Sequence, residues 1–135
     1  MKDKKSIIDI YYLELYQVYL VVANKYTTVK QLSKKYVYCN DEVLDDRILN
    51  GLATTSKCFD IKTGAKVVLV KYNKDSSVKG INKKVDRINT IAHEATHVAL
   101  DIYENLDQDI CYCTPEPFCY LVGWATECIY KTLTK

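Results

Sequence analysis

The sequence predicts a single small α+β domain, spanning residues 1–135, whose sheet is largely antiparallel. Two long stretches with helical periodicity lie in its second half, and two strand-like stretches joined by a glycine-containing turn precede them. The 135 residues suffice for one hydrophobic core, and the 48% hydrophobic and 27% charged content is that of an ordinary globular protein. We therefore expect about three strands packed against helices.

A strand and a short helix are expected near the start of the chain. Residues 15–22 are rich in Tyr, Val and Leu, which predicts a buried strand. Thr27 or Thr28 can act as the N-cap of a short helix that ends near Lys35. The polar residues 41–50 predict a loop or turn.

A hairpin and two helices follow. Residues 54–61 and 66–72 are strand-like, and Gly64 lies in the turn between them. No Pro or Gly interrupts residues 81–106, which predict a long helix. A second long helix is expected over 116–132, with its proline tolerated in the first turn.

Both histidines of the chain fall within one five-residue motif, H-E-x-x-H, formed by His93, Glu94 and His97. Residues four apart on an α-helix lie one turn above each other on the same face. Two imidazoles in that arrangement can bind one zinc ion, and the intervening glutamate can act as general base on a metal-activated water. The motif therefore predicts a zinc site on the first long helix.

The surroundings of the motif separate this reading from a coincidental His-Glu-His sequence on a solvated helix. Apolar and small residues recur around it at spacings of three and four, the helical period. They are Ile88, Ile91, Ala92, Ala95, Val98, Ala99, Ile102 and Leu106. An amphipathic helix with a buried face is the context that the zinc motif requires.

A catalytic zinc ion usually takes three protein ligands, so a third is needed. Asp101 lies one turn beyond His97 and is better placed to orient a ligand histidine than to bind the metal. Glu116 opens the second long helix, which can return antiparallel to the first, whereas Glu127 lies about three turns further along. The candidates downstream of the motif are Asp101, Glu104, Asp107, Asp109, Cys111, Cys113, Glu116 and Glu127.

A motif H-E-x-x-H followed by a helix-borne glutamate resembles the gluzincin metallopeptidases. Residues 116–123, Glu-Pro-Phe-Cys-Tyr-Leu-Val-Gly, are similar to the E-x-x-A-x-x-F-A helix of the ImmA/IrrE-like peptidases, with Cys119 in place of the alanine. In size and element order the chain is similar to the minigluzincins. It also resembles short uncharacterised phage proteins that contain the motif His-Glu-Ala-Thr-His. The resemblance covers roughly residues 52–131.

This resemblance implies a zincin-like fold in which His93, His97 and Glu116 bind Zn²⁺ and Glu94 is the catalytic base. It also implies that the hairpin offers an edge strand along which an extended peptide can lie. Many gluzincins carry an acidic residue four positions after the ligand glutamate, and this chain has Tyr120 there. The partner of one histidine is therefore not assigned.

The six cysteines allow a different zinc site. Cys111 and Cys113, together with His93 and His97, could form a closed structural site that leaves no ligand position for water. Structural sites usually use C-x₂₋₄-C spacing rather than C-x-C, which favours the open site with Glu116. Cys119 and Cys128 lie on the second long helix, where free cysteines usually pack as small apolar side chains.

Composition and charge exclude several classes of partner. The net charge is only +2 and the lysines are not clustered, which argues against nucleic-acid binding. Charged and polar residues interrupt the apolar stretch near the N-terminus, so neither a signal peptide nor a membrane segment is expected. We expect a cytoplasmic protein of a bacterium or of a phage-infected cell, with reduced thiols.

The sequence thus predicts a small zinc metallopeptidase that acts on a peptide or protein, and a protein partner that confers specificity is compatible with its small size. Two alternatives stay open. The chain can be a zinc-binding but non-catalytic structural or interaction protein, or a zinc-free α+β binding module.

Overall fold

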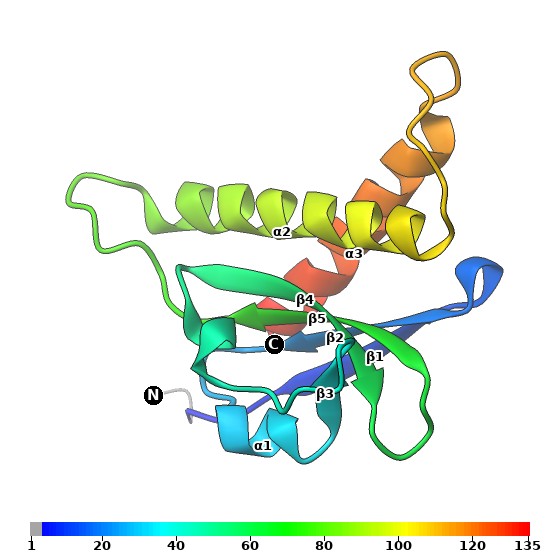
Figure 1. The fold of residues 1–135 in the computed structure, drawn as a ribbon. Coiled ribbons are helices and arrows are strands. Elements are labelled where there is room, and N and C mark those ends of the chain that lie inside the picture. Colours follow the sequence, from blue (N-terminus) through cyan, green and yellow to red (C-terminus); the bar gives the residue numbers. More distant parts are fainter. Residues whose placement is uncertain (1–3) are drawn as a thin grey trace.

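Five strands form one mixed sheet in the order β1-β2-β5-β4-β3 in the computed structural model, which describes residues 4–135 (Figure 1). The strands β2 and β5 pair in parallel, and every other neighbouring pair is antiparallel. The strands are β1 (Ile8–Leu13), β2 (Val18–Ala23), β3 (Tyr36–Tyr38), β4 (Ala53–Asp60) and β5 (Lys66–Tyr72).

Three α-helices accompany the sheet within the described residues: α1 (Val29–Ser33), α2 (Lys83–Asn105) and α3 (Glu116–Leu133). Two 3₁₀ helices, η1 (Glu14–Tyr16) and η2 (Asp46–Leu49), lie in connections. The side chain of Asn82 accepts hydrogen bonds from the amides of Lys84 and Val85 and so caps α2. No helix within residues 4–135 combines the length and the apolar character that crossing a membrane requires.

Two hydrophobic cores lie on opposite faces of the sheet. The larger core joins α2 and α3 to the sheet, and α3 crosses α2 on that face (Figure 1). Its buried members are Val18, Leu20, Val22, Val68, Val70, Ile91, Ala95, Val98, Ala99, Ile102, Tyr103, Leu121, Ala125, Cys128 and Ile129. The second core, on the side of α1, comprises Val21, Ala23, Leu32, Tyr36, Leu44, Ile48, Cys58, Val67 and Leu69.

The central strands β2 and β5 contribute to both cores, which explains their near-continuous apolar sequences. Alternate residues of β4 face the two sides instead, and Cys58 points into the second core. The β4–β5 turn places Gly64 at a φ of 73°, a conformation that glycine adopts without steric cost.

The α+β class, the hairpin, the capped short helix and the two long helices are confirmed. Thr28 is the N-cap of α1 and forms a capping box with Gln31. The predicted number of about three strands is wrong, since the sheet has five. The expected strand over 15–22 is β2 preceded by η1, and β1 lies upstream of it.

The chain reverses between β1 and β2 at Gln17, whose φ of 49° is left-handed. No glycine or Asn-Gly pair marks this turn, so the sequence does not show where one strand ends and the next begins. The predicted loop over 41–50 contains η2, whose Ile48 is buried in the second core. The strand β3 has three residues and is too short to show a recognisable alternation of apolar and polar residues in the sequence.

Candidate metal centre

The H-E-x-x-H motif lies in the middle of α2. Ile91, Ala95 and Val98 anchor this part of the helix in the larger core. Because His93 and His97 lie about half a turn away from Ala95 around the helix, both side chains are exposed and point away from the buried face of α2. The amphipathic pattern thus holds the helix in one rotational setting and directs both imidazoles to solvent.

The two imidazoles converge. Nε2 of His93 lies 3.2 Å from Nε2 of His97, and the ring planes are inclined by 68°. Two nitrogen ligands of one tetrahedral zinc ion lie about 3.3 Å apart, because each Zn–N bond is about 2.0–2.1 Å long. The separation of the histidine nitrogens therefore fits two ligands of one zinc ion.

The side chain of Glu94 turns from the histidines toward the sheet. Only 6% of this residue is exposed, and its Oε2 atom accepts a hydrogen bond of 2.5 Å from the hydroxyl of Thr55 on β4. The same hydroxyl lies 3.5 Å from the Glu94 carbonyl oxygen. A buried carboxylate with a hydroxyl donor is held in a defined orientation, as a positioned base requires.

Asp101 flanks the histidine pair on the face of α2 that turns toward β4. Burial raises the pKa of its carboxyl group to about 6, against the lowering effect of Lys57. Lys57 on β4 instead makes its ion pair with Glu104, with Nζ 2.7 Å from Oε1. No hydrogen bond joins Asp101 to His97 in the described part of the chain, so the expected orienting contact is not formed.

The first half of β4 borders this region. The short strand β3 pairs only with Cys58, Phe59 and Asp60, so no strand of the described sheet pairs with 53–56 on that side. Thr55, the donor to Glu94, lies within this stretch. The buried glutamate therefore lies next to a section of strand whose outer side has no strand partner.

Glu116 does not join the two histidines. It is the exposed first residue of α3, and two residues later Phe118 packs edge-on against Tyr103 at 5.2 Å between ring centroids. Tyr103 lies about 9 Å beyond His97 along the axis of α2. In Figure 1 the first turn of α3 accordingly rises beside the C-terminal end of α2.

Further along the same face of α3, Gly123 and Glu127 line a hollow together with Ile88 and Ala92 of α2. The carboxylate of Glu127 is paired with Lys131 at 2.9 Å. The part of α3 that passes beside Ala92 is therefore its middle, around Gly123 and Glu127, rather than the first turn that carries Glu116.

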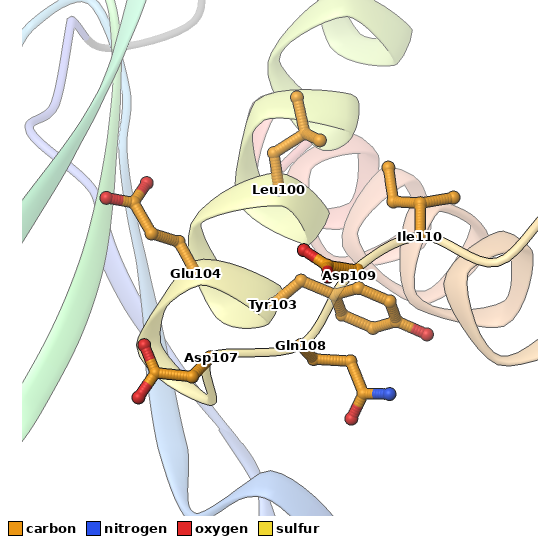
Figure 2. Close-up of a pocket in the computed structure, with 7 residues that line it drawn as sticks. All are labelled: Leu100, Tyr103, Glu104, Asp107, Gln108, Asp109 and Ile110. Atoms are coloured by element: carbon orange, nitrogen blue, oxygen red, sulfur yellow. The ribbon is translucent and has the colours of Figure 1, made fainter.

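The remaining candidate ligands lie around the end of α2. Leu100, Tyr103, Glu104, Asp107, Gln108, Asp109 and Ile110 line an open hollow there (Figure 2). The carboxylates of Glu104 and Asp107 point in different directions in Figure 2 and do not converge. Among residues 4–135, no three His, Cys, Asp or Glu side chains are grouped so that they could hold a metal ion.

The cysteines are all free thiols in the described residues. Cys111 and Cys113 are exposed in the connection between α2 and α3 and are not grouped with the histidines. Hydrogen bonding, led by Thr114, lowers the pKa of Cys111. Cys128 is buried as expected, whereas Cys119 is exposed.

Thr55 is the site residue that sequence reasoning missed. The strand that contains Thr55 was predicted from the sequence. The alternating pattern of a strand shows which residues share a face, but it does not show which residue of a helix packs against that face. The available signal was the polar side chain of Thr55 on the side of β4 that faces α2. A part-buried hydroxyl there needs a hydrogen-bond partner, and Glu94 of α2 is that partner.

No protein-family model, no curated protein and no solved structure matches this chain.

Proposed function

We propose that the protein is a small zinc-dependent metallopeptidase of gluzincin type with a zincin-like fold. The observation that carries this proposal is the separation of 3.2 Å between the Nε2 atoms of His93 and His97. Glu94, between them in the chain, has a buried and hydrogen-bonded carboxylate. Zinc at this position would supply a water of lowered pKa and a Lewis acid for the scissile carbonyl.

The chain's own groups have separate roles in this proposal. His93 and His97 hold the metal through Nε2, and Glu116 is the proposed third ligand. Glu94 accepts the proton of the attacking water and delivers it to the leaving amine. Thr55 keeps the Glu94 carboxylate on the sheet side of the motif through its hydroxyl.

The substrate proposed is an extended peptide that lies along residues 53–56 of β4. An unpaired strand section offers main-chain donors and acceptors that recognise any peptide backbone. Because Thr55 belongs to that section, a peptide bound there would pass close to Glu94. Backbone recognition of this kind leaves specificity to side-chain contacts or to a protein partner.

The position of Glu116 adds a requirement. For Glu116 to join the histidines, the first turn of α3 must approach the middle of α2 from its place beside Tyr103. The connection 106–115 is largely exposed and can allow such a movement. We propose that zinc binding draws the first turn of α3 toward His93 and His97.

A peptide-library cleavage assay with the zinc-loaded protein tests the proposed activity. Glu94→Gln should retain the metal and lose turnover, because the amide cannot accept the proton. Glu104→Gln is the matched control, since Glu104 is an exposed glutamate of the same helix. Retained cleavage in Glu94→Gln, or equal loss in both variants, would contradict the mechanism.

A zinc-binding protein without catalytic activity is the second candidate. It is favoured by the ligands present within residues 4–135, where His93 and His97 converge but no third His, Cys, Asp or Glu side chain is grouped with them. Zinc bound at about one ion per chain with no cleavage of any library peptide would support this alternative.

A further inference from the structure

The strand β1 has one open side. It occupies the edge of the sheet and pairs only with β2 among the described residues. The Ile7 carbonyl accepts a hydrogen bond of 3.0 Å from the Asn24 amide, which identifies the odd-numbered residues as those bonded to β2. The backbone N–H and C=O groups of Ile8, Ile10 and Tyr12 therefore point away from the sheet.

The side chains at these positions are apolar. Ile10 is 57% exposed and Tyr12 is 49% exposed, on the sheet face that carries α1. The Tyr12 ring lies 4.6 Å from the Tyr19 ring of β2, which extends the apolar surface inward. Exposed edge strands are usually protected by a charge, a proline or a bulge, and none of these occurs at residues 8, 10 or 12.

The other face of β1 is fixed to the C-terminal end of α3. The hydroxyl of Thr132 donates to Asp9 Oδ2 at 2.8 Å and lies 2.7 Å from the Tyr11 hydroxyl. Lys135 completes the contact with an ion pair of 2.8 Å to Asp9. These bonds hold the strand in place, so a partner strand would meet an edge that is already ordered.

We propose that β1 is the interface of a homodimer, in which the strands of two copies pair antiparallel and the two sheets become one. Pairing of all three outward-facing residues requires Ile10 to lie on the two-fold axis opposite Ile10 of the second copy. Ile8 then lies opposite Tyr12 of that copy, and roughly six main-chain hydrogen bonds form.

Charge complementarity supports this register. In this register Glu14, which starts η1 directly after the strand, reaches the level of Ser6 of the other copy, next to Lys4 and Lys5. These three charged side chains are exposed and make no ion pair within residues 4–135. A two-fold axis at Ile10 repeats the contact at both ends of the strand, so four lysines meet two glutamates.

The arrangement leaves the candidate metal centre accessible. β1 forms one edge of the sheet, and β4 with β3 lies at the other. The dimer therefore does not depend on the proposed zinc site or peptidase activity. Pairing of two short strands buries a small area, so association is expected to vary with protein concentration.

Sedimentation equilibrium over a roughly hundredfold concentration range measures this association. Ile10→Lys sets two like charges opposite each other on the axis and should raise the dimer dissociation constant at least about tenfold. Val43→Lys, at an exposed site away from β1, is the matched control and should leave it unchanged. A wild-type protein that stays monomeric throughout, or equal effects of both variants, would overturn the proposal.

Disulfide trapping tests the register, in a background with serine at the exposed Cys39, Cys111, Cys113 and Cys119. Residues opposite each other in a hydrogen-bonded pair have Cα atoms about 5.5 Å apart, within disulfide range. Ile10→Cys should therefore form a covalent dimer on mild oxidation. Tyr12→Cys should not, since the two copies of this residue would be offset by about 13 Å along the strands. Equal cross-linking of both variants would refute the register.

Discussion

The hydroxyl of Thr55 lies 2.5 Å from Oε2 of Glu94 and joins the sheet to the centre of the H-E-x-x-H motif. The two residues are 39 positions apart, so the contact exists only when β4 and α2 are packed together. It satisfies a carboxylate that is 6% exposed and fixes its direction relative to the histidines.

Removing this donor should destabilise the protein. Thr55→Val keeps the shape of the side chain and leaves the Glu94 carboxylate without its hydroxyl partner, at a cost of about 1–3 kcal/mol. Thr55→Ser keeps the hydroxyl and is expected to lose much less. Urea unfolding of the zinc-free protein measures both free energies. Equal stability of the valine variant and the wild type would show that the hydrogen bond does not contribute.

Asp101 should make the zinc-free protein less stable as the pH rises from about 4 to about 6. Burial raises its pKa from 3.8 to about 6, so in this interval the folded chain binds more protons than the unfolded chain. The loss on raising the pH is on the order of 2 kcal/mol. Asp101→Asn should remove this loss. Superimposable unfolding profiles for the wild type and Asp101→Asn across this interval would exclude a raised pKa.

Lys71 should produce the opposite trend at alkaline pH. Its residue is 1% exposed, and Nζ donates to the carbonyl oxygens of Asn24 and Tyr72 at 3.0 and 2.8 Å. Burial lowers its pKa from 10.5 to about 8, so the unfolded chain binds more protons between these values. Stability should therefore rise by about 3 kcal/mol as the pH increases through this window.

Lys71→Met tests this trend, because the variant has no proton to lose. Its free energy of unfolding should show a smaller rise between pH 8 and 10.5 than that of the wild type. Lys66→Met, at an exposed position of the same strand, is the control for the loss of one positive charge. A rise of the same size in Lys71→Met would assign the trend to other groups.

Zinc should protect the connection between α2 and α3 from hydrogen exchange. If Glu116 completes the site, the segment 106–120 becomes ordered against the motif, and its amides exchange more slowly in the zinc-loaded protein. Glu116→Ala should bind zinc more weakly and show no protection there. Protection confined to α2, or unchanged in Glu116→Ala, would exclude Glu116 as the third ligand.

The sequence was most informative where one period dominates a long segment. The spacing of Ile91, Ala95 and Val98 predicted α2 as an amphipathic helix, because one rotational setting of the helix buries all three. Gly64 marked the β4–β5 turn, since its left-handed backbone excludes most other residues. The convergence of His93 and His97 follows from helix geometry alone.

Tertiary relationships were harder to predict. The sequence contains no signal for where α3 crosses α2, because Phe118 and Tyr103 meet through a connection of irregular backbone. The prediction that Glu116 lies opposite the histidines assumed that α3 runs antiparallel to α2 and that its first turn packs beside the middle of α2. The strand β1 was missed because the turn that separates it from β2, formed by η1 and Gln17, contains no glycine or Asn-Gly pair that would mark a hairpin.

Zinc content is the most direct test of the central claim, that His93 and His97 form the metal-binding pair. The protein should be loaded with zinc, dialysed and measured by inductively coupled plasma mass spectrometry. We expect about one zinc ion per chain in the wild type and in Glu94→Gln, and almost none in a His93→Ala, His97→Ala double variant that remains folded. A wild type that retains no zinc, or a double variant that retains as much as the wild type, would contradict the account.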